Sequence, residues 1–211
     1  MKHDIRLASI DLDRTIIEGS FEVLMQYLGK VEESHELFKR YHAGQINYGQ
    51  WAGEEASWMQ GIDLQDVRRY LNPIKLTPGL GEFCSYLRDR EVKVGIISAG
   101  ADPLSNLLAE QFSLDFAIAN EFEVKDGVFT GRFNLRVDEG NKGDVLKQVM
   151  DDYGIPRENV LHVGDGISDV SAWQEVGHQA GIYHWNGKEK VAMFVTPVYR
   201  DFFELLESHK R

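Results

Sequence analysis

The sequence predicts an α/β fold, a doubly wound parallel sheet with a small helical insertion after its first strand. Short apolar runs of strand length alternate with helical patterns along most of the chain, which is typical of parallel strands joined by helices. Polar residues directly follow several of these runs, at the edge where such sheets bind their ligands. One stretch, residues 18–77, has helical spacing and no convincing strand.

Four apolar runs have the length and composition of buried strands. They are IRLASI (ending at residue 10), VKVGIIS (92–98), DFAIAN (115–120) and NVLHVGDG (159–166). Asp11 follows the first run, Ser98 closes the second and Asp165 lies at the end of the fourth. Because the carboxyl ends of parallel strands share one edge of a sheet, we expect these three side chains to lie close together.

Amphipathic patterns between the runs predict helices before and after the second strand and ahead of the fourth. These patterns cover residues 79–90, 102–112 and 142–153. Residues 121–134 alternate in polarity around Lys125-Asp126-Gly127, which indicates a hairpin.

The insertion is predicted to form a helical cap domain of residues 18–77 on a core domain of residues 1–17 and 78–211. Apolar residues such as Phe21 and Leu24 recur in it at helical spacing. Because the segment leaves the sheet just after the first acidic residues, it is well placed to act as a lid.

Charge and composition exclude several classes of function. The 211 residues carry a formal charge of −11, which argues against a nucleic-acid-binding surface. Cys84 is the only cysteine, so no internal disulfide can form and a cytoplasmic location is expected. No apolar run has the length of a signal peptide or a membrane span, so we expect a soluble protein without a membrane partner. The oligomeric state stays open.

Acidic residues at the strand ends predict a magnesium site. Mg²⁺ takes oxygen ligands, with one or two carboxylates and several waters. The carboxylates of Asp11 and Asp165, with the backbone carbonyl of Asp13, form a plausible ligand set, and Asp169 suits a supporting role behind it.

Other residues in the same places suit phosphoryl transfer. Ser98, with the amides of Ala99 and Gly100, could hold phosphoryl oxygens, and Lys142 at the start of a helix could neutralise charge. Aspartate can act as a nucleophile toward phosphorus, forming an aspartyl-phosphate. A metal ion would let an anionic substrate approach such a carboxylate.

These motifs resemble those of the haloacid dehalogenase superfamily of phosphatases, in order and in position relative to the strands. The matching residues are Asp11-x-Asp13-x-Thr15, Ser98, Lys142 and Gly164-Asp165-Gly166-x-x-Asp169. The segments ISAGADPL and HVGDGISDVSAW resemble those of the phosphoserine phosphatase branch, which carries a helical cap after the first motif.

The resemblance implies a Mg²⁺-dependent phosphatase acting on a small phosphorylated metabolite. It assigns Asp11 as the nucleophile and Asp13 as the acid that protonates the leaving oxygen and then activates water. Thr15 would help to fix the loop near the phosphoryl site, and Asp169 would orient Lys142 or a metal-bound water.

The sequence departs from that branch where the substrate is recognised. Ser20 stands where the branch has a glutamate for the substrate ammonium, and Glu55 aligns with an arginine for the substrate carboxylate. A carboxylate cannot replace an arginine in that role, so a changed specificity is expected. Ser168 replaces the usual asparagine of the fourth motif, and Arg14 replaces a commonly small residue.

Each residue also has a plainer interpretation. Asp-x-Asp alone is often a turn, Ser98 alone a strand-end cap and Lys142 alone a surface charge, so their joint order carries the prediction. Arg14 could meet an anionic substrate group or, as we expect here, pair with Glu18 one helical turn on. Tyr48 is expected to line the pocket, whereas His162 is expected to be structural. Trp51 and Trp58 are expected to pack in the core of the cap.

Two other functions stay open at this point. One is a binding or regulatory protein that keeps the fold and has lost turnover. The other is a phosphotransferase that passes the phosphoryl group to an acceptor hydroxyl instead of water.

Overall fold

The computed structural model describes residues 4–210. Its centre is a seven-stranded sheet in the order β4-β3-β2-β1-β5-β6-β7, in which neighbours are parallel except for the β3–β4 pair. The strands are β1 (Leu7–Ile10), β2 (Lys93–Ala101), β3 (Phe116–Lys125), β4 (Val128–Asn134), β5 (Val160–Gly164), β6 (His178–Ile182) and β7 (Val198–Tyr199). The predicted α/β fold class is confirmed.

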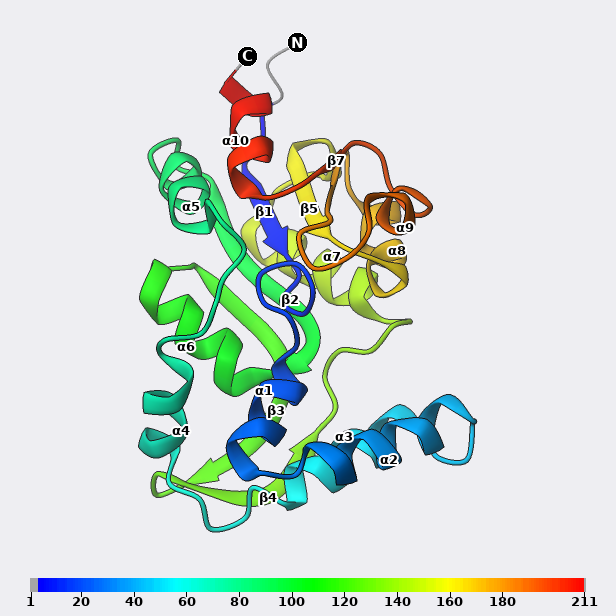
Figure 1. Cartoon of the computed structure of the whole chain (residues 1–211). Helices are drawn as coiled ribbons and strands as arrows, with labels where there is room; N and C mark the ends of the chain where they lie inside the picture. The colour runs from blue at the N-terminus through cyan, green and yellow to red at the C-terminus, as the bar shows by residue number, and fades with distance from the viewer. Residues whose placement is uncertain (1–3, 211) are drawn as a thin grey trace.

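Helices connect the strands and cover the sheet (Figure 1). Those of the core are α5 (Leu80–Arg88), α6 (Asp102–Phe112), α7 (Lys142–Tyr153), α8 (Val170–Glu175), α9 (Lys188–Ala192) and α10 (Phe202–Lys210), with short 3₁₀ turns η1 (Arg157–Asn159) and η2 (Ile167–Asp169). All three helices predicted around the strands are present. No helix among residues 4–210 has the length and apolarity needed to cross a membrane.

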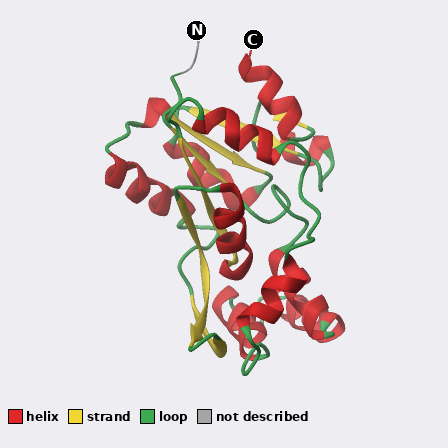
Figure 2. Cartoon of the chain, turned by 90° about the vertical axis from the view of Figure 1, so that its left-hand side faces the viewer, coloured by secondary structure: helices red, strands yellow, loops and turns green. Residues whose placement is uncertain are grey.

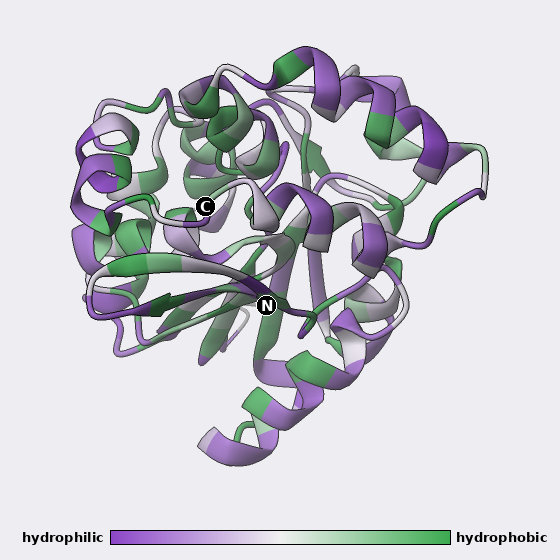
Figure 3. Ribbon diagram, turned by 90° about the horizontal axis from the view of Figure 1, so that it is seen from below, coloured by the Kyte–Doolittle hydropathy of each residue, from purple (hydrophilic) through white to green (hydrophobic). Residues whose placement is uncertain are grey.

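The central strands are the most apolar part of the chain. All residues of β1 and β5 are buried, as expected for parallel strands covered on both faces. Hydrophobic residues colour the strands, whereas the helices alternate hydrophobic and hydrophilic surfaces (Figure 3). The sheet is therefore a rigid base for the loops that leave its carboxyl edge.

Four helices occupy the segment between β1 and α5. They are α1 (Ser20–Leu28), α2 (Val31–His42), α3 (Tyr48–Ser57) and α4 (Leu64–Leu71). Helix α3 begins with a capping box in which Asn47 and Gln50 exchange hydrogen bonds between side chain and backbone. The domain boundaries at residues 17 and 77 stay a prediction, and residues 18–77 are called the cap below.

The hairpin predicted at 121–134 is present and reaches the cap. Strands β3 and β4 pair antiparallel and turn through Asp126 and Gly127, both with positive φ, as a two-residue hairpin turn requires. Residues 61–64 bond to this hairpin: Gly61 N donates to Phe129 O at 2.9 Å and Leu64 N to Gly127 O at 2.8 Å. The hairpin runs down beside the cap helices (Figure 2).

Two strands of the sheet were not predicted from the sequence. β6 reads HQAGI, with only three buried residues, and β7 has two residues, so neither forms an apolar run of strand length. Strand β3 also continues past the predicted residue 120 to Lys125, so the predicted strand and the first hairpin arm are one element.

Candidate active site

The carboxyl edge of β1 and β5 gathers the acidic residues. Asp11 follows β1, and its amide extends the ladder by donating to Val163 O at 2.9 Å. One carboxylate oxygen from each of Asp11, Asp165 and Asp169 lies within 4.8 Å of the other two. Two of these acids, Asp11 and Asp165, are residues that the sequence placed at this edge.

Lys142 bridges the two buried acids of this group. It starts α7, is completely buried, and donates from Nζ to Asp11 Oδ1 at 2.9 Å and to Asp169 Oδ1 at 2.7 Å. Burial opposes its charge, but the attraction of the two carboxylates outweighs this effect and raises the pKa of Lys142. Lys142 is therefore a fixed cation beside the Asp11 carboxylate.

Asp169 is held by donors on every side. His162 Nε2 lies 3.0 Å from Asp169 Oδ1, and the amides of Asp165 and Gly166 donate to Oδ2 at 2.9 and 3.2 Å. A Cβ at Gly164 would come within 2.2 Å of this carboxyl group, so only glycine fits there. Because its oxygens are already occupied, Asp169 positions Lys142 rather than offering a free metal ligand.

His162 and Asn186 belong to the site, although sequence reasoning missed both. His162, expected to be structural, also contacts Ser9 Oγ through Nδ1 at 3.2 Å, so it links β1 to Asp169 inside the sheet. Asn186, in the loop after β6, donates to Asp165 Oδ2. The HVGDG context of His162 was the available signal; no motif pointed to Asn186.

Crowding and burial set the charge states of these acids. Burial raises the pKa of Asp11 to about 6, although Lys142 works against this. Burial, with repulsion from Asp169 and Asp11, raises the pKa of Asp165 to about 8. Burial would also raise the pKa of Asp169, but Lys142 and His162 hold it below its usual range.

Asp13 is oriented by Ser20. Ser20 N donates to Asp13 Oδ1 at 2.6 Å and Ser20 Oγ to Asp13 Oδ2 at 2.9 Å, while Ser20 Oγ accepts from Ala101 N at 2.9 Å. Burial raises the pKa of Asp13, and the bonds from Ser20 oppose this rise. A Cβ at Gly100 would lie 2.7 Å from Asp13 Oδ2, so Gly100 leaves the room that Asp13 occupies.

The end of β2 carries the predicted phosphoryl contacts, where its pairing with β3 is irregular between Ile97 and Ala101. Ser98 is buried at the strand end, and its Oγ accepts from Gly100 N at 3.0 Å, which leaves the Ser98 hydroxyl proton available. The Gly100 amide is thus bonded within the end of β2, and its contact with a phosphoryl oxygen stays a prediction. Thr15, two residues after Asp13, is completely buried, and its Oγ1 has no hydrogen-bond partner among the described residues.

The cap residues lie differently from the sequence expectation. Ser20, expected to face the substrate, is buried with its hydroxyl turned to Asp13. Glu55 is buried between α2 and α3, accepting from Ser34 Oγ at 2.6 Å and Trp51 Nε1 at 2.9 Å. Tyr48 donates from Oη to the carbonyl of Ala99, so this cap side chain touches the end of β2.

Arg14 and Ser168 are at the margin of the site. Arg14 is exposed, has a left-handed backbone with φ of 59°, and forms no ion pair with a described residue. The expected pairing with Glu18 is therefore wrong, because the chain turns here and does not form the helix that would place residues four apart together. Ser168 is half-buried in η2 and its side chain makes no hydrogen bond to a described residue.

The residues at this edge fit a divalent cation with hard oxygen ligands. Burial, together with the negative charge of Asp169, raises the pKa of both Asp11 and Asp165, and a cation bound to their free oxygens would stabilise the charged carboxylates. The backbone carbonyl of Asp13 completes the predicted set. Within residues 4–210, no other cluster of three His, Cys, Asp or Glu side chains has this spacing.

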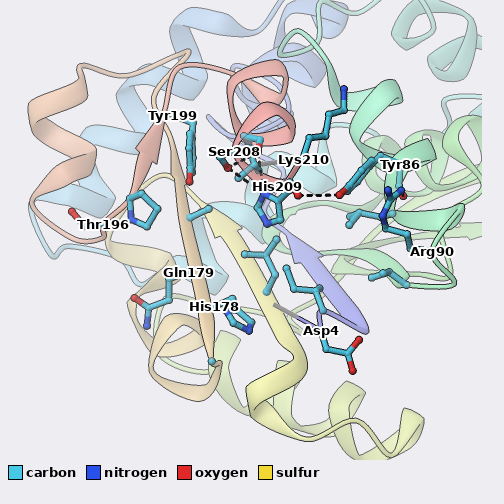
Figure 4. A pocket seen from close by; sticks show the side chains of 18 residues that line it. Asp4, Tyr86, Arg90, His178, Gln179, Thr196, Tyr199, Ser208, His209 and Lys210 are labelled. Carbon is cyan, nitrogen blue, oxygen red and sulfur yellow. Dashed lines mark hydrogen bonds between the residues drawn. The ribbon is translucent and has the colours of Figure 1, made fainter. Parts of the chain in front are cut away.

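A cavity of about 1250 Å³ lies far from these acids. It opens at the amino ends of β1, β5 and β6, beside α10 (Figure 4). Arg90 covers the Tyr86 ring there, and Tyr86 Oη donates to His209 O at 3.2 Å. Ser208 Oγ and His209 Nδ1 also line this cavity, 3.2 Å apart, and both contact the backbone carbonyl of Leu205 in their own helix.

Comparison with known proteins agrees with this geometry. The family model of the haloacid dehalogenase-like hydrolases matches residues 8–174, a range that contains every residue of the carboxyl edge described above except Asn186. The chain belongs to the haloacid dehalogenase-like hydrolase family.

Phosphoserine phosphatases are among the most similar members of this family. That of Archaeoglobus fulgidus is 31% identical over 166 residues, which are 78% of this chain and 48% of the relative. That of Methanocaldococcus jannaschii is 29% identical over 179 residues, 84% of this chain and 85% of the relative. The chain therefore spans about half the length of the first relative and most of the second.

Solved structures of the family share the fold. A phosphoserine phosphatase solved as a phospho-aspartyl intermediate analogue has a TM-score of 0.78 and 26% identity, covering 97% of this chain and 99% of its own. A HAD family hydrolase from Salmonella enterica serovar Typhi reaches a TM-score of 0.84 at 22% identity, covering 95% of this chain and 69% of its own.

Proposed function

We propose that this protein is a Mg²⁺-dependent phosphomonoesterase that hydrolyses a small phosphorylated metabolite through an aspartyl-phosphate on Asp11. The observation that carries the proposal is the buried Lys142, fixed between Asp11 and Asp169 at the carboxyl edge of the sheet. A cation held there neutralises the charge that accumulates when a carboxylate and a phosphoryl group approach each other.

In the first step, Asp11 attacks phosphorus. One carboxylate oxygen of Asp11 forms the new O–P bond and the other stays available to the metal, while Lys142, which donates to Oδ1, offsets the negative charge of the carboxylate. The ester P–O bond breaks, and the leaving oxygen takes a proton from Asp13. The buried hydroxyls of Ser98 and Thr15 are available to donate to the phosphoryl oxygens.

In the second step, Asp13 works in reverse. Its carboxylate takes a proton from a water molecule, the water oxygen bonds to phosphorus, and the Asp11–phosphorus bond breaks to release inorganic phosphate. Ser20 binds both oxygens of Asp13 and so limits the directions in which this acid can point.

The metal would be held by the carboxylates of Asp11 and Asp165 and the backbone carbonyl of Asp13. When bound, Mg²⁺ supplies positive charge that lets an anionic phosphate enter an acidic site. Asn186 and the backbone of the Asp165 loop orient the Asp165 carboxylate.

The substrate is inferred to be small because the cap covers the site, with Tyr48 contacting Ala99. Phosphoserine phosphatases among the relatives support a phosphorylated metabolite. Ser20 and Glu55 differ from the residues expected for phosphoserine, which supports a changed specificity. A cytoplasmic location stays a prediction.

The test is phosphate release from p-nitrophenyl phosphate with Mg²⁺, with EDTA, and by Asp11→Asn. We expect release with Mg²⁺, none with EDTA, and a loss of at least about 10³-fold in Asp11→Asn, since removal of a nucleophile abolishes the covalent step. Circular dichroism should show that the variant is folded. A fully active Asp11→Asn protein would contradict the mechanism.

A further inference from the structure

The loop after β6 contacts two separate parts of the active site through neighbouring side chains. Asn186 donates to Asp165 Oδ2. The residue before it, Trp185, is half-buried, and its indole Nε1 donates to Thr77 Oγ1 at 2.8 Å. One loop of the core is therefore bonded both to an acid of the carboxyl edge and to the last residue of the cap.

Thr77 joins the end of the cap to the turn of residues 13–17, which we call the Asp13 turn. The Thr77 hydroxyl is buried and bonded on both sides, because it accepts from Trp185 and donates to Thr15 O at 2.7 Å. The Thr77 amide donates to Ile16 O at 2.8 Å. One residue therefore holds two consecutive carbonyls of this turn.

The Asp13 turn has a strained backbone that needs such support. Arg14 has a φ of 59°, a left-handed conformation that costs free energy for a residue other than glycine. Inside the turn, Arg14 N donates to Ile17 O at 2.6 Å. A conformation of this kind persists where the surrounding structure restrains it, and the bonds from Thr77 restrain this turn from outside.

Two groups of the proposed reaction belong to the same turn. Asp13 is its first residue, and Thr15, at its middle, is completely buried with a hydroxyl that has no partner among the described residues. Because Thr77 binds the carbonyl of Thr15, it fixes the peptide plane next to the carbon that carries this hydroxyl. A misplacement of reacting groups by about 1 Å can cost about 10² in rate, so the restraint matters for turnover.

The Trp185 ring is itself held in place. Lys75 Nζ lies 5.2 Å from the ring centroid, and the His184 ring packs against it edge-on at 4.9 Å between centroids. The indole N–H therefore reaches Thr77 from a fixed position. Phenylalanine at position 185 would keep an aromatic ring between these neighbours and remove only the donor, so this change isolates one hydrogen bond.

We propose that Trp185 and Thr77 are positioning residues for the phosphatase reaction, because their hydrogen bond fixes the Asp13 turn. Asp13 and the Thr15 hydroxyl are then held where they meet the phosphoryl group. The inference rests on the proposed phosphatase function and extends it to two residues outside the four motifs. Since neither residue touches the substrate in this role, loss of their bond should lower kcat and leave KM nearly unchanged.

The test measures kcat and KM for p-nitrophenyl phosphate with saturating Mg²⁺, and Tm to verify that each variant is folded. We expect Trp185→Phe to lower kcat about tenfold and to change KM less than about twofold. The matched control is Trp58→Phe. Trp58 is also half-buried, with Lys30 Nζ 4.9 Å from its ring centroid, but its indole donates to no described residue, so this variant should keep the kcat of the unmodified protein.

Thr77 provides the second half of the test. Thr77→Val removes the shared hydroxyl and should lower kcat at least as far as Trp185→Phe, whereas Thr77→Ser keeps the hydroxyl and should keep most of the activity. Because both residues act through one hydroxyl, the double variant Trp185→Phe/Thr77→Val should be no slower than Thr77→Val alone. Independent effects would instead multiply to about 100-fold or more.

An unchanged kcat in Trp185→Phe, or a double variant in which the two effects multiply, overturns the inference. If Thr77→Val does not fold, the comparison of Trp185→Phe with Trp58→Phe decides by itself, and equal kcat values in these two variants overturn the inference. Absence of p-nitrophenyl phosphate turnover in the unmodified protein would overturn the proposed function and the inference together, whereas turnover that Trp185→Phe leaves unchanged overturns the inference alone.

Discussion

Asp169 and Glu55 are both carboxylates without exposed surface, yet they differ in the charge of their donors and in the bonding of the second carboxylate oxygen. Asp169, at the edge of the sheet, accepts from Lys142, His162 and two backbone amides, and its pKa is held below its usual range. Glu55, in the cap, has two donors on one oxygen and none on the other, and burial raises its pKa to about 7.

The difference teaches that burial alone does not determine what an acid does. At the carboxyl edge, Asp169 is bonded through both oxygens and holds Lys142 beside Asp11, as a fixed electrostatic environment requires. In the cap, Oε2 of Glu55 is buried without a hydrogen-bond donor among the described residues. The predictions below separate the two regions, beginning with the largest expected effect.

Asp169→Asn should damage both stability and turnover. It removes one of the two charges bound by Lys142 and leaves that cation buried with Asp11 alone. Breaking a buried ion pair costs about 3–5 kcal/mol, which guanidinium unfolding can measure. The exposed Asp151→Asn is the matched control, and equal stability of the two variants would contradict the network described for the carboxyl edge.

Gly100→Ala should lower turnover by about 10²-fold with little effect on unfolding. Its Cβ would lie 2.6 Å from Ser20 Oγ and 2.7 Å from Asp13 Oδ2, so the catalytic acid must move, and a displacement of this kind can cost about 10² in rate. Steady-state kinetics with p-nitrophenyl phosphate measures the effect. Gly187→Ala, where the new atom meets nothing closer than 3.8 Å, should behave as the unmodified protein.

Asn186→Ala should lower the affinity of the site for Mg²⁺ while the reaction itself still proceeds. Loss of its bond to Asp165 Oδ2 frees the carboxylate to turn, and the loss of such a supporting contact costs about 10–100-fold in metal affinity. Titration of activity with Mg²⁺ should shift to higher concentration while the maximal rate is largely kept. An unshifted curve, matching that of the exposed Asn72→Ala, would show that Asn186 does not position Asp165.

The smallest effect should be on the pH dependence of stability. Because the pKa of Glu55 is raised to about 7 in the folded protein from about 4.3 when unfolded, the folded state binds more protons between these values. Stability contributed at this site is therefore lost as pH rises from about 4.3 to 7.

The measurement is Tm at pH 5 and pH 8 for the unmodified protein, Glu55→Gln and Glu54→Gln. Glu55→Gln has no charge to bury, so its Tm should fall less between the two pH values. Parallel Tm changes in all three proteins would mean that Glu55 does not carry the raised pKa.

The carboxyl edge could be predicted from the sequence because each residue is tied to the end of a regular element. Asp11 and Asp165 follow strands, Ser98 lies near the end of β2, and Lys142 opens a helix, so the direction of the chain determines where they meet. The same logic fails where contacts join distant loops. Asn186 reaches Asp165 from a segment with no predicted element, and His162 was assigned a structural role because only the folded sheet brings it to Asp169.

The cap was less predictable for a different reason. The helical spacing of residues 18–77 predicts helices but not which face turns inward once α2 and α3 pack together. Alignment to a family pattern placed Ser20 and Glu55 as substrate contacts, whereas Ser20 bonds to Asp13 and Glu55 bonds within the cap. The pairing of Arg14 with Glu18 failed because the left-handed backbone of Arg14 turns the chain.

Backbone hydrogen bonds join residues 61–64 of the cap to the β3–β4 hairpin. They restrict the cap motions by which substrate could enter the active site and phosphate could leave it. The cap cannot lift away from the sheet as a free body without breaking these bonds. If they persist, these bonds become a pivot, and the cap swings so that the gap widens where Tyr48 meets Ala99. Substrate and phosphate would then pass between Tyr48 and the end of β2, on the side of the cap away from the hairpin.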